Sequence, residues 1–138
     1  MKKLLFISTL LLLYCFHAAA QKVMQKIVID FTKPDTADFR FMIRQLNNVV
    51  KEAPNTRVEV VCSMGGLFIL VKDKTNVAAD ISELQKVFDI KFVACANTMH
   101  ARHVEKDQLL PAITIVPVAI LELAGKQQEG YSYLKAGQ

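Results

Sequence analysis

The sequence lacks the motifs that mark several large classes of enzyme and binding protein. Gly65 and Gly66 follow an apolar run, but the third glycine of a dinucleotide-binding fingerprint is missing, and no Walker-type phosphate loop is present. No Ser/His/Asp order and no paired carboxylates suited to acid–base catalysis occur either. From these absences we expect a protein that uses no cofactor.

The first residues are set apart from the rest of the chain. Residues 1–20 are typical of a secretory signal peptide, because Lys2 and Lys3 precede an apolar run over 4–16 and small residues occupy 18–20. The apolar run is too short to span a bilayer comfortably. We therefore predict a signal peptide over 1–20, export to the periplasm, and no membrane attachment after cleavage.

The part expected to fold, residues 21–138, is one domain's worth of chain. Without Lys2 and Lys3 its formal charge falls from +4 to +2, and no stripe interleaves basic residues with aromatics, so we expect no nucleic acid partner. Cysteine is scarce there, since only Cys62 and Cys95 remain. In an oxidising compartment two cysteines suggest one disulfide, but the pairing depends on the strand order, which the sequence leaves open.

Apolar runs rich in β-branched residues alternate with helical patterns along this part of the chain. The runs predict strands over 26–31, 57–62, 91–95, 113–116 and 131–134. A strand, a helix and a second strand in succession imply a right-handed crossover and a parallel pair. No internal repeat or low-complexity linker interrupts the alternation. We therefore predict a three-layer α/β/α domain with a mainly parallel sheet of about five strands.

Three longer helices are predicted between these strands. Apolar residues over 39–53 recur three and four positions apart, which draws one stripe along a helix. Asp80 and Glu83 have the spacing of a capping box, and the helix they begin is expected to bury Leu84, Val87 and Phe88. A helix is predicted over 118–126 with apolar residues on most of its circumference, which is typical of a helix that faces another subunit.

A thiol is predicted where the strand over 91–95 ends and a helix starting at Asn97 and Thr98 begins. In open α/β folds ligands bind at the carboxyl edge of the sheet, and a helix N-terminus favours thiolate over thiol. We therefore expect Cys95 to be exposed at this edge and nucleophilic, with His100, Arg102 or His103 as activating neighbours. The alternative is a small buried hydrophobic residue, since free cysteine is often buried.

Other residues have more than one interpretation. His100 and His103 share a helix face and could ligate zinc or copper together with Cys95, although the ligand spacing is loose. Histidines in such a pattern more often lie exposed to solvent at the rim of a site. The Gly65–Gly66 turn would let the backbone approach a ligand or a neighbouring segment closely. Cys62 is interpreted as a packed structural thiol. Glu59, in a strand that otherwise looks buried, is expected to face a partner subunit or to mark a sheet edge.

Several motifs together resemble a known family. They are the opening strand with its long helix, the run 92–99 (FVACANTM) followed by Arg102, the pair Val116-Pro117, and the closing run 128–133 (QEGYSY). With these motifs the chain, from about residue 26 to its end, resembles the DsrE/DsrF-like family, which includes TusD-type sulfur-relay subunits and small single-domain relatives. The chain departs from the family pattern at Asp89 and His103, where glycine is usual, and at Val118-Ala119, where a Ser-Gly pair is frequent.

The resemblance implies a flavodoxin-like α/β/α fold that assembles into homo-oligomers, either trimers or hexamers. It also implies that Cys95 matches the cysteine that carries a persulfide in the relay members. We therefore predict an exported sulfur carrier or sulfurtransferase whose sulfur donors and acceptors are proteins or small sulfane compounds. The alternative is a non-catalytic oligomeric module that binds a small molecule or partner at the same rim, and metal binding at Cys95, His100 and His103 is a third option.

Overall fold

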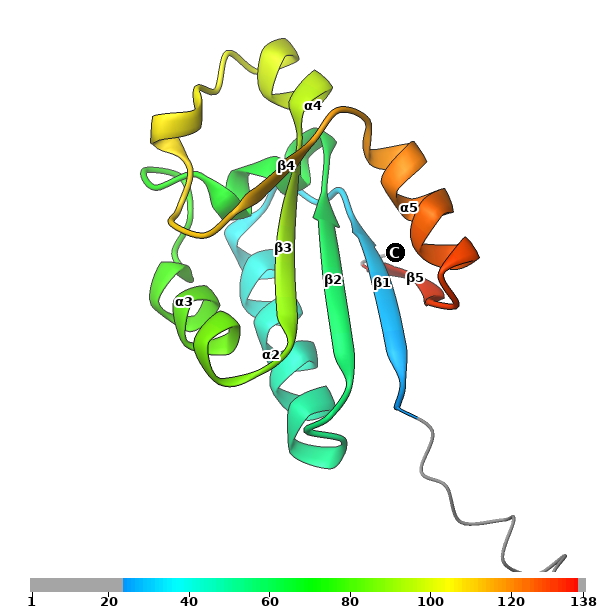
Figure 1. The fold of residues 1–138 in the computed structure, drawn as a ribbon. Coiled ribbons are helices and arrows are strands. Elements are labelled where there is room, and N and C mark those ends of the chain that lie inside the picture. The colour runs from blue at the N-terminus through cyan, green and yellow to red at the C-terminus, as the bar shows by residue number, and fades with distance from the viewer. Residues whose placement is uncertain (1–23, 137–138) are drawn as a thin grey trace, which may run out of the picture.

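The computed structural model describes residues 24–136, so the predicted signal peptide lies outside the described residues. Five strands alternate with four α-helices and two short 3-10 turns in the described part (Figure 1). In chain order they are β1 (Lys26–Phe31), α2 (Thr36–Glu52), β2 (Arg57–Cys62), a 3-10 turn (Met64–Leu70), α3 (Ala78–Val87), β3 (Ile90–Cys95), α4 (Ala96–Ala101), a 3-10 turn (Lys106–Gln108), β4 (Thr114–Val116), α5 (Ala119–Gln128) and β5 (Ser132–Ala136).

The five strands form one parallel sheet in the order β4-β3-β2-β1-β5. Helices α2 and α3 cover one face of the sheet, α5 covers the other, and α4 lies at the carboxyl edge (Figure 1). The predicted three-layer α/β/α domain with a parallel sheet is therefore confirmed. Since β2 is central in the sheet, the expectation that Glu59 marks a sheet edge is wrong.

The two faces of the sheet carry apolar clusters of different size. The larger cluster lies beneath α2 and α3, where the predicted helical stripe buries Phe39, Met42, Ile43, Leu46 and Val50. The cluster beneath α5 consists of seven buried residues: Val28, Val61, Val93, Cys95, Ala119, Leu123 and Tyr131. Helix α5 itself buries only Ala119 and Leu123, so few apolar contacts hold it on the sheet.

Helix α3 differs from its prediction at both ends. It begins at Ala78 after the N-cap Val77, so Asp80 lies in the first turn rather than at the cap. The N–H of Val77 donates to the Thr75 hydroxyl at 3.3 Å, and this local bond places the start of the helix earlier than the capping-box pattern does. Val87 is 64% exposed rather than buried, because the last residue of α3 points away from the sheet.

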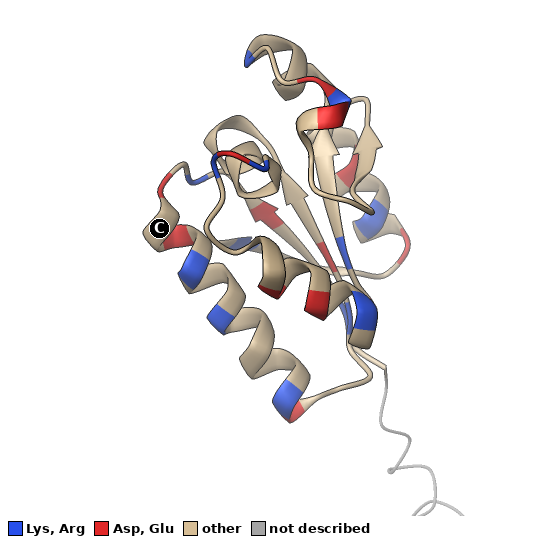
Figure 2. Cartoon of the chain, turned by 90° about the vertical axis from the view of Figure 1, so that its left-hand side faces the viewer, with Lys and Arg blue, Asp and Glu red and all other residues tan. Residues whose placement is uncertain are grey.

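Charges of both signs are mixed over the α2 and α3 face. The ribbon of α2 carries basic residues along its length with an acidic residue near each end, and α3 beside it carries acidic residues and a basic residue at its end (Figure 2). In α2 these residues are Asp38, Arg40, Arg44, Lys51 and Glu52, and in α3 they are Asp80, Glu83 and Lys86. Within residues 24–136 no helix combines the length and apolarity that crossing a membrane requires.

Candidate functional site

Cys95 is the last residue of β3 and the N-cap of α4. It is 4% exposed, so the predicted exposure of its sulfur is wrong. The reason is the connection from β4 to α5, which passes over the sulfur and leaves the carbonyl oxygen of Pro117 4.0 Å from Sγ. The residues that cover the sulfur, Pro117 and Asn97, are themselves exposed. The thiol therefore lies directly beneath the surface of the carboxyl edge.

Hydrogen-bond donors surround the Cys95 sulfur. Burial alone would raise the pKa of the thiol, but the Thr98 hydroxyl and the N–H groups of Thr98, Ala119 and Asn97 act in the opposite direction and lower the pKa on balance. Two of these N–H groups belong to the first turn of α4, and the third is the first of α5. The beginnings of two helices thus stabilise one thiolate.

Thr98 connects the thiol to the turn after β2. Its Oγ1 accepts a hydrogen bond from the N–H of Met64 at 3.3 Å, which leaves the hydroxyl proton free to be donated to the sulfur. Met64 has a positive φ of 52° and an exposed side chain. The structure therefore brings Cys95, Asn97 and Thr98 together beside the turn that also contains Gly65 and Gly66.

The two glycines of this turn pack against protein. A Cβ at Gly65 would lie 2.7 Å from the Cβ of Pro34, and a Cβ at Gly66 would collide with the carbonyl of Phe31. Both glycines are buried. The close approach expected of this turn is thus to the end of β1 and to Pro34 in the segment that follows it.

His100, Arg102 and His103 lie at the opposite end of α4 from Cys95, and their side chains are exposed. The Arg102 guanidinium lies 5.9 Å from the centre of the Phe68 ring. His103 has a positive φ of 54°, which explains why glycine is usual at this position in the family that the sequence resembles. In the described part of the chain no three His, Cys, Asp or Glu residues are placed to hold a metal ion, so Cys95, His100 and His103 do not form the metal site considered above.

Cys62 is a packed structural thiol, as predicted. It is fully buried, and burial, together with the charge of Asp30, raises its pKa. Cys62 packs in the cluster beneath α2 and α3, whereas Cys95 packs in the cluster beneath α5, and both thiols are free. The disulfide suggested by the cysteine count is therefore not formed.

The sequence interpretation missed Pro117 and Ala119 as neighbours of the thiol. They are more than twenty positions from Cys95 and approach it because β4 pairs with β3, with Val116 opposite Cys95. The pair Val116-Pro117 was singled out only as part of the resemblance. A prediction of strand order would have been needed to place it beside the sulfur.

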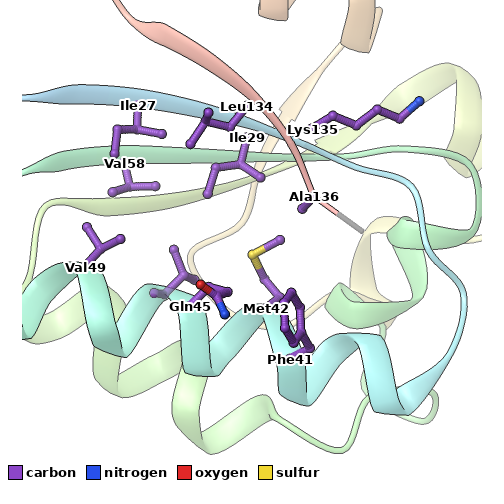
Figure 3. Close-up of a pocket in the computed structure, with 11 residues that line it drawn as sticks. Ile27, Ile29, Phe41, Met42, Gln45, Val49, Val58, Leu134, Lys135 and Ala136 are labelled. Atoms are coloured by element: carbon purple, nitrogen blue, oxygen red, sulfur yellow. The ribbon is translucent and has the colours of Figure 1, made fainter. Parts of the chain in front are cut away.

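A separate apolar groove of about 290 Å³ lies between α2 and the strands β1 and β5. Phe41 and Met42 of α2 face Ile29 and Leu134 of the two strands across it (Figure 3). The groove is on the α2 side of the sheet, whereas Cys95 packs beneath α5. It is therefore not part of the thiol site.

The chain is similar to three solved structures. The protein of unknown function MTH1491 from Methanobacterium thermoautotrophicum has 26% identity and a TM-score of 0.75, over 80% of this chain and 98% of that one. The ychN protein from E. coli has 15% identity and a TM-score of 0.68, over 81% and 99%. The conserved protein of unknown function BT1422 from Bacteroides thetaiotaomicron has 16% identity and a TM-score of 0.66, over 84% and 98%. At these identities the last two show the fold alone.

The remaining comparisons concern curated proteins and protein families. No curated protein matches the sequence. The model of the DsrE/DsrF-like family matches residues 24–136, which includes every described strand and helix. The chain therefore belongs to the DsrE/DsrF-like family.

Proposed function

We propose that the protein is an exported sulfur carrier that holds a persulfide on Cys95. The observation that supports this most is the lowered pKa of a thiol that ends a strand and receives hydrogen bonds from the first turns of two helices. A thiolate is the nucleophilic form of cysteine, and lowering its pKa makes more of it available at neutral pH. Membership of the DsrE/DsrF-like family supports the same chemistry.

The proposed transfer has two steps. The Cys95 thiolate attacks the outer sulfur of a donor persulfide, a new S–S bond forms, the donor's S–S bond breaks, and the donor leaves as a thiolate. A thiolate of the acceptor then attacks the outer sulfur of Cys95, and Cys95 leaves as a thiolate again. No net oxidation or reduction occurs, and the donor and acceptor are proteins or small sulfane compounds.

The burial of Cys95 sets a condition on this chemistry. At 4% exposure Cys95 offers little surface to a donor or an acceptor, so we expect the connection through Pro117 to move outward during transfer. Pro117, whose carbonyl oxygen lies 4.0 Å from the sulfur, is exposed, and a displacement of the adjoining first turn of α5 would uncover the thiol.

The test is mass spectrometry of the mature protein after exposure to a sulfane donor. We expect a gain of about 32 Da, one sulfur atom, that disappears on reduction, because persulfidation of a reactive thiol is reversible. Cys62→Ser is the matched control and should keep the gain, whereas Cys95→Ser should lose it. A gain that survives in Cys95→Ser would rule the proposal out.

A second candidate function is a non-catalytic binding module that uses the same edge of the sheet. The burial of Cys95 favours it, because a cysteine with only 4% of its surface exposed can simply be part of a packed cluster. On this hypothesis Cys95 should alkylate no faster than an unperturbed thiol with a pKa of about 8.5. Fast alkylation at neutral pH would contradict the module and support the carrier.

A further inference from the structure

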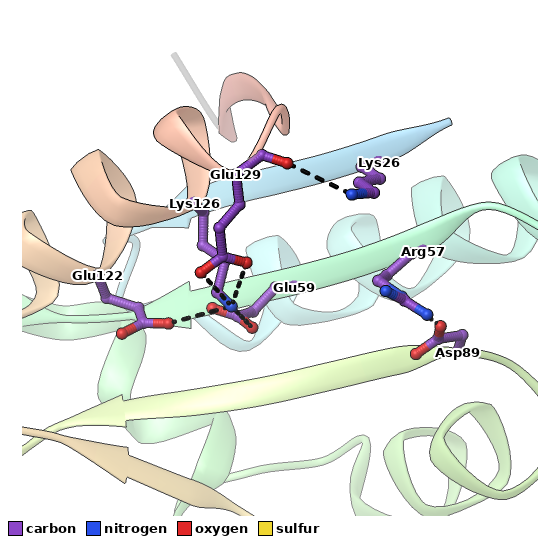
Figure 4. A network of polar contacts seen from close by, with 7 residues as sticks. All are labelled: Lys26, Arg57, Glu59, Asp89, Glu122, Lys126 and Glu129. Carbon is purple, nitrogen blue, oxygen red and sulfur yellow. Dashed lines mark hydrogen bonds and ion pairs between the residues drawn. The ribbon is translucent and has the colours of Figure 1, made fainter. Parts of the chain in front are cut away.

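The structure holds a partly buried charge cluster between α5 and the sheet that the proposed transfer does not use. Glu59 lies on β2 with 4% of its surface exposed, and its Oε2 is 3.5 Å from Nζ of Lys126 on α5. Lys126 also pairs with Glu122 at 3.7 Å and with Glu129 at 3.2 Å (Figure 4). One lysine of α5 is thus surrounded by three carboxylates, one of which belongs to the sheet.

Glu59 can bind α5 in either protonation state. When it is ionised it pairs with Lys126, and when it is protonated it can share its proton with the neighbouring Glu122 carboxyl. Its Oε1 is buried and accepts no hydrogen bond in the described structure. Other titratable neighbours are Lys91, opposite Glu59 in the β3 register, and Tyr131, whose ring lies 5.4 Å from Nζ of Lys126. Lys26 lies on the far side of the cluster, with its Nζ 5.6 Å from the Tyr131 ring and 3.3 Å from the carbonyl oxygen of Glu129.

The charge cluster contributes to the packing of α5 on the sheet, because α5 has few apolar contacts. Its only buried side chains are Ala119 and Leu123. Ala119 is the residue whose N–H reaches the Cys95 sulfur, and it precedes Lys126 by seven positions, which is two helical turns on the same side of α5. Because a helix is rigid over two turns, the ion pair between Glu59 and Lys126 also fixes the position of the Ala119 N–H, which stabilises the thiolate.

We infer that Glu59 is a positioning residue for Cys95. By binding Lys126 it fixes α5 on the sheet, and this holds the Ala119 N–H against the sulfur. The inference rests on the proposed function, because it concerns the reactivity of the same thiol. Arg57, two residues earlier on β2, pairs at 2.5 Å with Asp89 just before β3 (Figure 4) and also interacts with Tyr131, so it is not independent of the cluster. Glu83 is independent of it, because α3 covers the other face of the sheet.

The test is the pH profile of Cys95 alkylation by iodoacetamide in the mature protein carrying Cys62→Ala. The plateau rate at high pH reports access to the sulfur, and the pH of half-maximal rate reports its ionisation. In Glu59→Leu we expect the half-maximal point to move to higher pH. The rate at pH 7, divided by the plateau rate, should fall roughly ten-fold, the factor expected for losing one hydrogen bond to a charged group.

Two further variants and one control complete the design. Glu59→Gln should keep the original profile, because its amide can accept from Lys126 and donate to Glu122. The control Glu83→Leu, at an exposed position of α3, should also leave the profile unchanged. Should Glu59→Leu fail to fold, Lys126→Met is expected to show the same shift. An unshifted profile in whichever of these two variants folds would overturn the inference while leaving the carrier intact. An unperturbed profile in the parent protein would overturn the proposed function and this inference together.

Discussion

Thr98 is the residue on which the local chemistry of the thiol depends most directly. Its hydroxyl accepts from the Met64 N–H and donates to the Cys95 sulfur, so a single side chain joins the turn after β2 to the thiol at the end of β3. The sequence interpretation included Thr98 as a helix-start residue. Its contact with Met64 follows from the pairing of β2 with β3, which brings the ends of these two strands together.

Thr98→Val tests this contribution. The variant keeps the shape of the side chain but removes the hydroxyl, so the pKa of the Cys95 thiol should rise and the thiolate fraction at neutral pH should fall several-fold to roughly ten-fold. Ultraviolet absorbance of the thiolate, titrated against pH, measures the change. Thr98→Ser keeps the hydroxyl and serves as the control. Matching titrations of Thr98→Val and the parent protein would show that the hydroxyl contributes nothing.

The glycines differ in the space that the structure leaves for a Cβ atom, so alanine substitutions at Gly66 and Gly125 should have different effects on stability. Gly66→Ala places a Cβ against the carbonyl of Phe31, and we expect a loss of about 2 kcal/mol or more in the free energy of unfolding. Gly125→Ala is the control, because nothing lies within 4 Å of its Cβ position in α5, and it should raise stability by up to about 1 kcal/mol. Urea unfolding measures both. Equal effects would contradict the packing interpretation of the Gly65–Gly66 turn.

At the scale of elements, α5 combines an apolar contact, an ion cluster and a hydrogen bond to the thiol. Burial, followed by the nearness of Glu122, raises the pKa of Glu59 to about 7, although Lys126 acts in the opposite direction. The docking of α5 therefore includes a carboxyl group that changes its charge near neutral pH. Burial would lower the pKa of Lys126, but the three surrounding carboxylates raise it on balance.

A pH dependence of stability follows from Glu59. Because folding raises its pKa from 4.5 to about 7, the folded protein binds this proton more tightly than the unfolded chain does. The stabilisation is complete below about pH 4.5 and is lost as the pH rises to about 7, by at most about 3 kcal/mol. Urea unfolding at pH 5 and pH 8 should show this loss in the parent protein and a smaller one in Glu59→Gln. An equal loss in both proteins would exclude Glu59 as its source.

The elements that the sequence predicted well are those with a strong local signal. The run Lys26–Phe31 and the stripe of α2 need no knowledge of distant residues, because their periodicity reflects burial on one or both faces. The orientation of Val87 and the burial of Cys95 could not be predicted, since each depends on which segment passes over it. For Cys95 that segment is the connection after β4, whose position is set by strand order.

At the scale of the whole molecule, the α5 layer leaves apolar surface uncovered. Ile120 is 75% exposed and Leu121 69% exposed, and both follow directly on Ala119. Large apolar side chains clustered on one surface are typical of an interface with another chain. This surface supports the proposal that the protein forms a homo-oligomer through α5, with the thiol sites close to the contact.

Replacement of Ile120 and Leu121 by Asp should test this assembly. Charged side chains buried unpaired in an interface are strongly unfavourable, so we expect a monomeric double variant and a parent protein with the mass of the proposed trimer or hexamer. Light scattering after size-exclusion chromatography measures the mass. Val87→Asp, on the exposed end of α3, is the matched control and should keep the parent mass. An unchanged mass in the double variant would place the interface elsewhere.

The placement of the two thiols on opposite faces of the sheet has a consequence for oxidative damage. Because β2 and β3 direct Cys62 and Cys95 into different clusters, residues 24–136 hold no resolving partner that could close a ring with an oxidised Cys95. Within this part of the chain, a sulfenic acid formed at Cys95 would be repaired by a thiol supplied from outside. Each polypeptide would therefore depend on its surroundings for every return to the reduced state.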